Sequence, residues 1–373
     1  MTMFDDIRPY DDAETAAALK RASNNRLMEQ ISAFLFPGKD PDILRNTLNT
    51  IHSVDDFQTR VMYPAVKSII SKTTKGLSYE GLDYFRGGSC YTMLSSHRDI
   101  VLDSAFIQYI LKDNYLPLTE IAVGDNLIYN QFVEDLMRSN RMIKVARTTS
   151  PHEAYESSCK LSAYIRNRLQ DENPASVWIS HRNGRTKDGF DQTEQGLLKM
   201  LSLSGEGDFV ENMSGVRIMP VSISYEIEPC GIRKAYETYI KKVKGMYVKR
   251  PGEDLESIVY GIVQYKGRVH VAFCKPVTVE ELSECSGLAK NERFRALARI
   301  IDDRILESWK IWPTNIAALE LLEGRPASNK PVTEEFEKNL AEDLRTLPLS
   351  GSRKAIKEIL IRIYATPAMR KGL

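Results

Sequence analysis

The sequence predicts an α/β protein: a mostly parallel sheet flanked by helices, with helical N-terminal and C-terminal segments. From about residue 78, short apolar runs alternate with helical stretches, and on either side of that part the apolar residues recur at helical spacing. Strands separated by helices are typical of parallel sheets that are covered on both faces. The 373 residues, of which 42% are hydrophobic, are sufficient for a sizeable core.

Three parts follow from this pattern. Residues 1–78 are expected to form a helical N-terminal subdomain, residues 79–285 an α/β domain, and residues 286–373 a helical C-terminal extension. The predicted strands are 90–94, 120–123, 142–146, 177–180, 216–225 and 269–273, and the predicted helices between them include 100–111, 132–137 and 152–169. Ligands of such sheets bind beyond the carboxyl ends of the strands. The loops after these strands are therefore where functional residues are expected.

Composition excludes several classes of protein. The 51 basic residues nearly balance the 50 acidic ones, which argues against a nucleic-acid-binding protein. The five cysteines are an odd number without a two-residue gap between any pair, so neither a disulfide framework nor a zinc site is expected, and a reducing cytoplasm fits. The sequence contains neither a signal-peptide pattern nor the roughly 18–20 apolar residues of a membrane span.

A first candidate site follows the predicted strand 90–94. His97 stands there with Asp99 and Asp103 close behind it. A histidine whose ring is oriented by a carboxylate can act as a general base. The alternative interpretation is an ordinary loop histidine followed by aspartates that cap the next helix.

A second candidate site follows strand 177–180. The segment 182–189 contains three cations and two glycines, among them Gly184, Arg185 and Lys187. Glycines allow close backbone approach, and an arginine fork can bind two phosphate oxygens at once. A solvated basic loop is the alternative. Arg147, at the carboxyl end of strand 142–146, is a weaker candidate, and His181 is expected to have a positioning role.

Four segments, taken in order, resemble the motifs of the glycerolipid acyltransferase family, which includes glycerol-3-phosphate and lysophosphatidate acyltransferases. His97 with a downstream aspartate is similar to the first motif, and residues 142–147 to the second, an apolar strand that ends in arginine. Asn183-Gly184-Arg185 lies where the family has Glu-Gly-x-Arg or a relative, and residues 220–223 resemble the fourth, proline-containing motif. The resemblance covers about residues 65–280.

The resemblance implies a mechanism. His97, oriented by Asp103, would deprotonate a hydroxyl of a glycerol phosphate-type acceptor, which then attacks a thioester. Arg185, with Arg147 and Lys187, would hold the phosphate, and the family's phosphate-binding motif also places Asn183 and Gly184 beside it. The acyl donor would be acyl-coenzyme A or acyl carrier protein, and neither a metal nor an organic cofactor is implied. The expected role is in phospholipid synthesis.

Two positions depart from the family pattern. The family has four residues between histidine and aspartate, whereas five separate His97 from Asp103, and Asp99 lies too early. Asp103 is the preferred partner because residues 100–102 look like the start of the next helix. The family glutamate is also missing, and Asn183 or Arg182 stands in its place. Two alternatives therefore remain: the same chemistry on another lipid precursor, such as an amino-acid lipid, and a catalytically silent protein that binds lipid or acyl carrier.

One further segment, residues 239–250, mixes cations with apolar and aromatic side chains. Such a patch suits an anionic bilayer or an acidic carrier protein. The corresponding hypothesis is peripheral contact with the inner face of the cytoplasmic membrane. The alternative is an ordinary exposed loop and strand.

Overall fold

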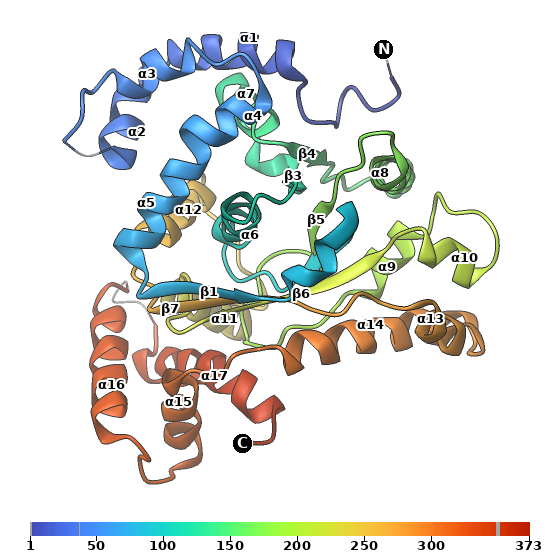
Figure 1. The fold of residues 1–373 in the computed structure, drawn as a ribbon. Helices are drawn as coiled ribbons and strands as arrows, with labels where there is room; N and C mark the ends of the chain where they lie inside the picture. The colour runs from blue at the N-terminus through green and yellow to red at the C-terminus, as the bar shows by residue number, and fades with distance from the viewer. Residues whose placement is uncertain (1, 37, 348–350) are drawn as a thin grey trace.

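The computed structural model describes residues 2–36, 38–347 and 351–373. Its centre is a seven-stranded sheet with helices on both faces, which confirms the predicted fold class (Figure 1). The strand order is β1-β7-β6-β2-β5-β3-β4. The strands are β1 (Gly76–Glu80), β2 (Thr92–Ser95), β3 (Glu120–Gly124), β4 (Met142–Val145), β5 (Val177–Ser180), β6 (Ile218–Tyr225) and β7 (Arg268–Phe273).

All neighbouring strands are parallel except β6 and β7, which pair antiparallel. The five strands β4, β3, β5, β2 and β6 therefore end at the same edge of the sheet, and β7 and β1 end at the opposite edge. The loops that follow β2 to β6 consequently meet in space. Candidate site residues from distant parts of the sequence lie in these loops.

Alternating side chains of the strands form two cores. In β2, Met93 packs on one side of the sheet and Leu94 on the other, and both are fully buried. The Met93 side is covered by α5 (Tyr63–Thr73) and α6 (Leu102–Asp113), whose Phe106 and Ile107 are also fully buried. The Leu94 side is covered by a different set of helices: α8 (Pro151–Gln170), α9 (Gln195–Leu201), α10 (Phe209–Ser214), α13 (Val279–Ser286) and α14 (Lys290–Glu307).

Smaller helical groups lie at both ends of the chain (Figure 1). The first contains α1 (Asp12–Ser23), α2 (Met28–Leu35), α3 (Ile43–Leu48) and α4 (Val54–Phe57), which continues into α5 through a π-helical turn, and α7 (Gln131–Ser139) packs on α1. The second contains α11 (Gly231–Lys244), α15 (Pro313–Glu323), α16 (Lys330–Arg345) and α17 (Arg353–Arg370). The predicted boundaries at residues 78 and 285 stay predictions. Within the predicted N-terminal and C-terminal parts, residues 1, 37 and 348–350 lie outside the described residues.

Some elements differ from those predicted. The strand β1 was not predicted, because it is an exposed edge strand that lacks a buried apolar run. Helix α6 begins at Leu102 rather than residue 100, since residues 98–101 form a turn. The helices between residues 190 and 286 were also missed, namely α9, α10, α11, α12 (Glu253–Val263) and α13. The alternative interpretation of residues 239–250 as loop and strand is wrong for the strand, because residues 239–244 belong to α11 and residues 245–250 are coil.

No helix in the described part of the chain combines the length and the apolar character that crossing a membrane requires.

Candidate active site

His97 and Asp103 lie together at the carboxyl end of β2. Nδ1 of His97 is 3.2 Å from Oδ2 of Asp103, and the carboxylate is fully buried while the imidazole is 14% exposed. Within the described residues Nε2 of His97 has no hydrogen-bond partner. If Nδ1 donates to the carboxylate, Nε2 is left as an acceptor that a substrate hydroxyl can reach.

Three further donors hold the Asp103 carboxylate in place. Oδ2 accepts the backbone N–H groups of Arg98 at 2.7 Å and Asp99 at 2.9 Å. Oδ1 accepts the hydroxyl of Tyr225 at 2.7 Å. Burial and the charge of Asp103 raise the pKa of Tyr225 well above its ordinary value, so this hydroxyl stays a donor. A carboxylate bound by several donors has a fixed orientation, which in turn fixes the imidazole.

Asp99 has a different task. Its Oδ1 accepts the backbone N–H groups of Val101 at 2.9 Å and Leu102 at 2.8 Å, where α6 begins. Burial, followed by the charge of Asp103, raises the pKa of Asp99. The turn that Asp99 closes accommodates the additional residue between His97 and Asp103. Asp103, and not Asp99, is thus the carboxylate that contacts the imidazole of His97, in agreement with the preferred pairing. The catalytic roles of these residues stay predictions.

The loop after β5 lies directly against the loop of His97. The backbone N–H of Thr186 donates to the carbonyl oxygen of His97 at 2.7 Å. Gly184, at φ +77°, allows the left-handed turn before Arg185. Nη1 of Arg185 is buried and has no hydrogen-bond partner within the described residues. A buried guanidinium nitrogen without a partner is suited to an anionic ligand, because such a group is costly to leave unpaired.

The other predicted phosphate ligands differ in whether their charge is already paired. Arg147, after β4, donates through Nη1 to the amide oxygen of Asn183, so the two loops touch. Lys187 forms an ion pair with Glu237 of α11, and burial lowers the pKa of Lys187. The charge of Lys187 is thus already neutralised by a carboxylate. Arg147 and Arg185 remain the cations best placed to bind a phosphate.

These residues line a cavity of about 350 Å³ between the loops. Its polar wall includes His97, Arg147, Arg185 and Lys187. The rest is largely apolar, with Val101, Val123, Leu136, Met142, Trp178 and Ile258 among the lining residues. Such a cavity combines a base, an anion site and an apolar compartment.

A second, smaller cavity of about 180 Å³ adjoins the first. It shares Val101, Ser104 and Met142 with the cavity of His97 and extends between α5 and α6. Its other lining residues are mainly apolar, such as Val66, Ile69 and Ile262. The two cavities together give an apolar path that leads away from His97.

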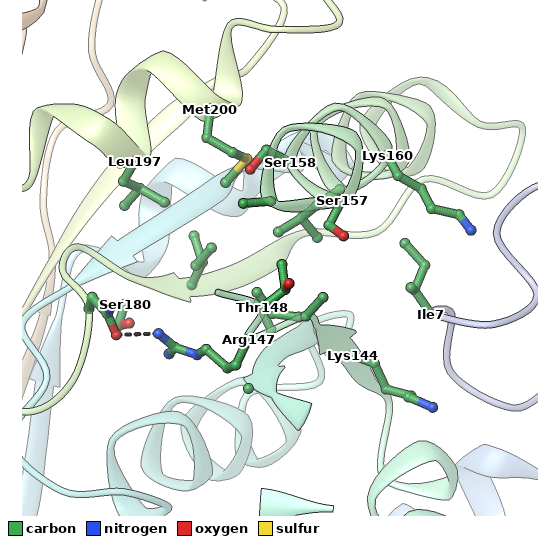
Figure 2. Close-up of a pocket in the computed structure, with 18 of the residues that line it drawn as sticks. Ile7, Lys144, Arg147, Thr148, Ser157, Ser158, Lys160, Ser180, Leu197 and Met200 are labelled. Carbon is green, nitrogen blue, oxygen red and sulfur yellow. Dashed lines mark hydrogen bonds between the residues drawn. The ribbon is translucent and has the colours of Figure 1, made fainter. Parts of the chain in front are cut away.

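A third cavity, of about 570 Å³, lies on the other side of Arg147 (Figure 2). Arg147 and Ser180 belong to its wall and also to that of the His97 cavity, whereas His97 and Arg185 do not line it. Figure 2 shows Ser157, Ser158 and Lys160 of α8 around this space. Arg147 therefore lies between the cavity that contains His97 and a neighbouring cavity whose lining mixes polar residues with apolar ones such as Leu197 and Met200.

A buried cluster of charged side chains packs against the loop that contains His97. The guanidinium of Arg98, 1% exposed, contacts Asp191 at 2.6 Å and Glu228 at 3.1 Å and lies 4.4 Å from the ring centre of Trp309. Lys234 donates to the carbonyl oxygen of Arg98 at 2.6 Å and to Glu228 at 2.5 Å. Each buried charge therefore has a partner, as burial requires.

Helix α17 packs against the loops that follow β5 and β6 and forms hydrogen bonds with them. The hydroxyl of Tyr364 accepts the backbone N–H of Glu228 at 3.0 Å, and the hydroxyl of Thr366 donates to the carbonyl oxygen of Asp188 at 3.0 Å. Arg370 donates to the carbonyl oxygen of Asp191 at 2.7 Å. The approach is close, since a Cβ on Gly189 would lie 2.4 Å from a carbonyl oxygen of α17.

Sequence reasoning missed two residues that shape the site. Tyr225 ends the predicted strand 216–225, but its contact with Asp103 depends on β6 lying beside β2, which the sequence does not show. Arg98 is next to His97, yet its partners are far away in the sequence. A buried arginine could have been suspected only from the carboxylates at positions 191 and 228, whose proximity depends on the fold.

Comparison with known proteins gives two curated relatives. The dihydroxyacetone phosphate acyltransferase of Homo sapiens is 22% identical over 236 residues, which are 62% of this chain and 32% of that protein. The enzyme of the same name from Oryctolagus cuniculus is 21% identical over 229 residues, 60% of this chain and 31% of that protein. The chain thus spans about a third of the length of the curated relatives it matches.

These relatives confirm the resemblance to glycerolipid acyltransferases that the four motifs predicted. No protein-family model matches the chain. Among solved structures, the crystal structure of the 1-acyl-sn-glycerophosphate (LPA) acyltransferase PlsC from Thermotoga maritima aligns with a TM-score of 0.41 and 12% identity, over 79% of this chain and 95% of that one.

Proposed function

We propose that this protein moves a fatty acyl group from a thioester donor to a hydroxyl of a glycerol phosphate-type acceptor, in phospholipid synthesis. The observation that carries the proposal is the His97–Asp103 pair, 3.2 Å apart, in the wall of a cavity that also contains Arg147 and Arg185. A base beside an anion site is what transfer to a phosphate-bearing alcohol needs. The curated relatives, both named dihydroxyacetone phosphate acyltransferases, support the same reaction class.

In the proposed mechanism, Nε2 of His97 takes the proton of the acceptor hydroxyl. The oxygen attacks the thioester carbonyl, and the tetrahedral intermediate collapses with loss of the thiolate. The imidazolium then returns its proton to the leaving sulfur, which is released as a thiol. The Asp103 carboxylate, buried and held by Tyr225 and two backbone N–H groups, stabilises the imidazolium between these steps.

The two arginines would position the acceptor. A phosphate bound by Arg185 and Arg147 would hold the hydroxyl near His97, and such fixation of reactants is a large source of rate enhancement. The free Nη1 of Arg185 supports its role as the principal ligand. Lys187, already paired with Glu237, would contribute less than the sequence suggested.

The apolar path away from His97 suits the acyl chain. The chain of a bound thioester would lie along Val101 and Met142, which belong to both the cavity of His97 and the adjoining apolar cavity. The donor would be acyl-coenzyme A or acyl carrier protein, and the reaction as written needs neither a metal ion nor an organic cofactor.

A second candidate is the same chemistry on another lipid precursor, such as an amino-acid lipid. The observation that favours it is the place of the family glutamate, where Asn183 contacts Arg147 and Arg182 is the other residue that could align. A different side chain at this position would change which acceptor the loop binds. The silent-protein alternative is less favoured, because the displaced aspartate still reaches the imidazole.

Thiol release tests the proposal. Wild type and His97→Ala are given palmitoyl-coenzyme A or palmitoyl carrier protein, with glycerol 3-phosphate, dihydroxyacetone phosphate, lysophosphatidate or no acceptor. We expect release that depends on one of these acceptors and disappears in the variant. A parallel assay contains an amino-acid lipid precursor as acceptor, and release that occurs only there would select the second candidate. Release from no combination, or release that does not depend on His97, would contradict the proposed chemistry.

A further inference from the structure

Helix α12 exposes its bulky side chains. Leu255, Val259 and Val263 lie four residues apart and are 47%, 52% and 47% exposed. Residues at this spacing form one stripe along a helix. Scattered exposed aliphatics are ordinary on a protein surface, but a stripe on one helix marks a surface that contacts something apolar.

The buried residues of α12 are small. Ser257 and Gly261 are buried there. A Cβ on Gly261 would lie 2.3 Å from Oδ2 of Asp99, so the helix comes close to the turn after His97. The helix also packs on α5, next to which it lies in Figure 1. Three aliphatic side chains of α12 thus face solvent, where an amphipathic helix usually places polar residues.

The segment before α12 is strongly basic. Residues 239–252 contain Lys241, Lys242, Lys244, Lys249 and Arg250 and no acidic residue. Lys249 pairs with Asp254 at 2.5 Å, and Arg250 lies 3.2 Å from Glu256, so part of this charge is neutralised by the first turn of α12.

The remaining charge is accompanied by apolar surface. Lys242 and Lys244 form no ion pair within the described residues. Beside them in the sequence, Met246 and Val248 are 66% and 75% exposed. Cations and exposed aliphatics therefore occur together in the end of α11, the following coil and α12.

The same helix forms part of the walls of the candidate active site. Ile258 and Leu255 line the cavity of His97, and Ile262 lines the adjoining apolar cavity. Residues 255, 258, 259, 262 and 263 form a continuous apolar face, one edge of which borders the cavities and the other solvent. An apolar molecule on the outer face would therefore be separated from the cavity of His97 by α12 alone.

We propose that residues 241–263 form an interfacial surface that binds an anionic lipid bilayer. The aliphatic stripe of α12 would insert at the headgroup boundary, while Lys242 and Lys244 contact anionic headgroups, as in amphipathic helices that lie in a membrane interface. This rests on the proposed function, because the acylated product of such an enzyme is a lipid that has to enter a bilayer. An acidic carrier protein would match the cations but not the aliphatic stripe.

Flotation with lipid vesicles tests the surface. The full chain is mixed with phosphatidylcholine vesicles that contain or lack 30% phosphatidylglycerol, a probe composition of about one anionic lipid in three. We expect binding to the anionic vesicles that weakens with salt. Lys242→Gln together with Lys244→Gln should lower the partition coefficient roughly 25-fold, about fivefold for each cation. Val259→Asn together with Val263→Asn should lower it about tenfold and also reduce the salt-resistant part.

Matched controls remove the same groups elsewhere. Lys330→Gln with Lys338→Gln removes two exposed cations of α16, and Val279→Asn with Leu288→Asn changes two exposed aliphatics near α13. Both should bind vesicles like the wild type. Thiol release from short, soluble acyl-coenzyme A should be unchanged in all four variants, none of which alters a residue of the His97 cavity.

The outcomes separate the two proposals. If vesicle binding is absent, or equal in all variants, the proposal that residues 241–263 bind a bilayer is contradicted, whether or not thiol is released. Capture of acyl carrier protein in place of vesicles, lost with Lys242 and Lys244, would assign the surface to an acidic protein. Self-association lost with Val259 and Val263 would assign it to a second copy of the chain. Absence of thiol release with intact vesicle binding would overturn the function and leave the surface.

Discussion

Oδ2 of Asp103 lies 3.2 Å from Nδ1 of His97 although five residues separate them, one more than in the related family pattern. The additional residue is taken up in the turn that Asp99 closes against the backbone of Val101 and Leu102. A change in spacing that appears disabling in the sequence is thus compensated locally, and the pair keeps the arrangement of a general base with its orienting carboxylate.

The two aspartates should respond differently to amide substitution. Asp103→Asn should lower kcat by about 10⁴-fold, because the imidazole loses the carboxylate that fixes its tautomer and stabilises its charge. Asp99→Asn keeps an oxygen for the backbone N–H groups of α6 and should change kcat by less than about threefold. Acceptor-dependent thiol release measures both. Equal losses in the two variants would contradict the assignment of Asp103.

The phosphate site can be tested at two neighbouring arginines. Arg185→Gln should raise the KM for the phosphate acceptor about 10- to 100-fold, since a charged hydrogen bond is lost, with a smaller effect on kcat. Arg182→Gln is the matched control, because Arg182 lines the third cavity and not that of His97. Initial rates against acceptor concentration distinguish them. A larger effect at Arg182 would move the phosphate into the neighbouring cavity.

The buried cluster under the His97 loop should contribute strongly to stability. Arg98→Met leaves Asp191 and Glu228 without their cation and should lower the free energy of unfolding by about 3–5 kcal/mol. Arg295→Met, which removes an exposed pair with Glu292 on α14, should cost less than about 1 kcal/mol. Urea unfolding measures both. A small effect at Arg98 would mean that the loop relaxes without its ion pairs.

Acid should destabilise the fold partly through His181. Burial lowers the pKa of this fully buried imidazole to about 4, against 6.5 in an exposed chain. A group whose pKa is lowered on folding stabilises the protein above the unfolded pKa, and this stabilisation is lost as the pH falls through the folded pKa. Between pH 6.5 and 4 the loss should reach ~3 kcal/mol.

The variant His181→Gln should show a shallower loss of stability over the same interval, while His152→Gln, at an exposed position, should behave like the wild type. Urea unfolding at several pH values gives the comparison. Asp302, with a pKa raised to about 6 by burial, acts in the opposite direction in the wild type and the variants alike. Identical curves for His181→Gln and the wild type would assign the acid sensitivity to other groups.

The elements that the sequence predicted are those with a buried apolar run. β5 and β6 are almost completely buried, and apolar residues dominate both, although Ser222 and Ser224 interrupt the run in β6. β1 is exposed at the edge, and α12 places Leu255, Val259 and Val263 outward, so neither follows the pattern that a core imposes. The spacing of apolar residues in the sequence predicts an element only where those residues are buried. It does not predict an element that is exposed or that places apolar side chains toward solvent.

The candidate site divides along a similar line. His97, Arg147 and Arg185 each follow a predicted strand, so the rule that ligands bind at the carboxyl ends of strands was enough to find them. Tyr225 and the partners of Arg98 depend on which strands are neighbours and on where α17 docks. The ion pair of Lys187 with Glu237 likewise needs α11 in place. Such pairings are set by tertiary structure and have no local signal.

The contacts of α17 affect the order in which parts of the protein fold during synthesis. Tyr364, Thr366 and Arg370 hold the loops that follow β5 and β6, yet they are made about 140–180 residues later than those loops. During synthesis, the sheet and its two cores can form while the loops around His97 are still unsupported. The catalytic geometry is therefore expected to be the last part of the fold to become ordered, and a nascent chain that ends before α17 would be folded but inactive.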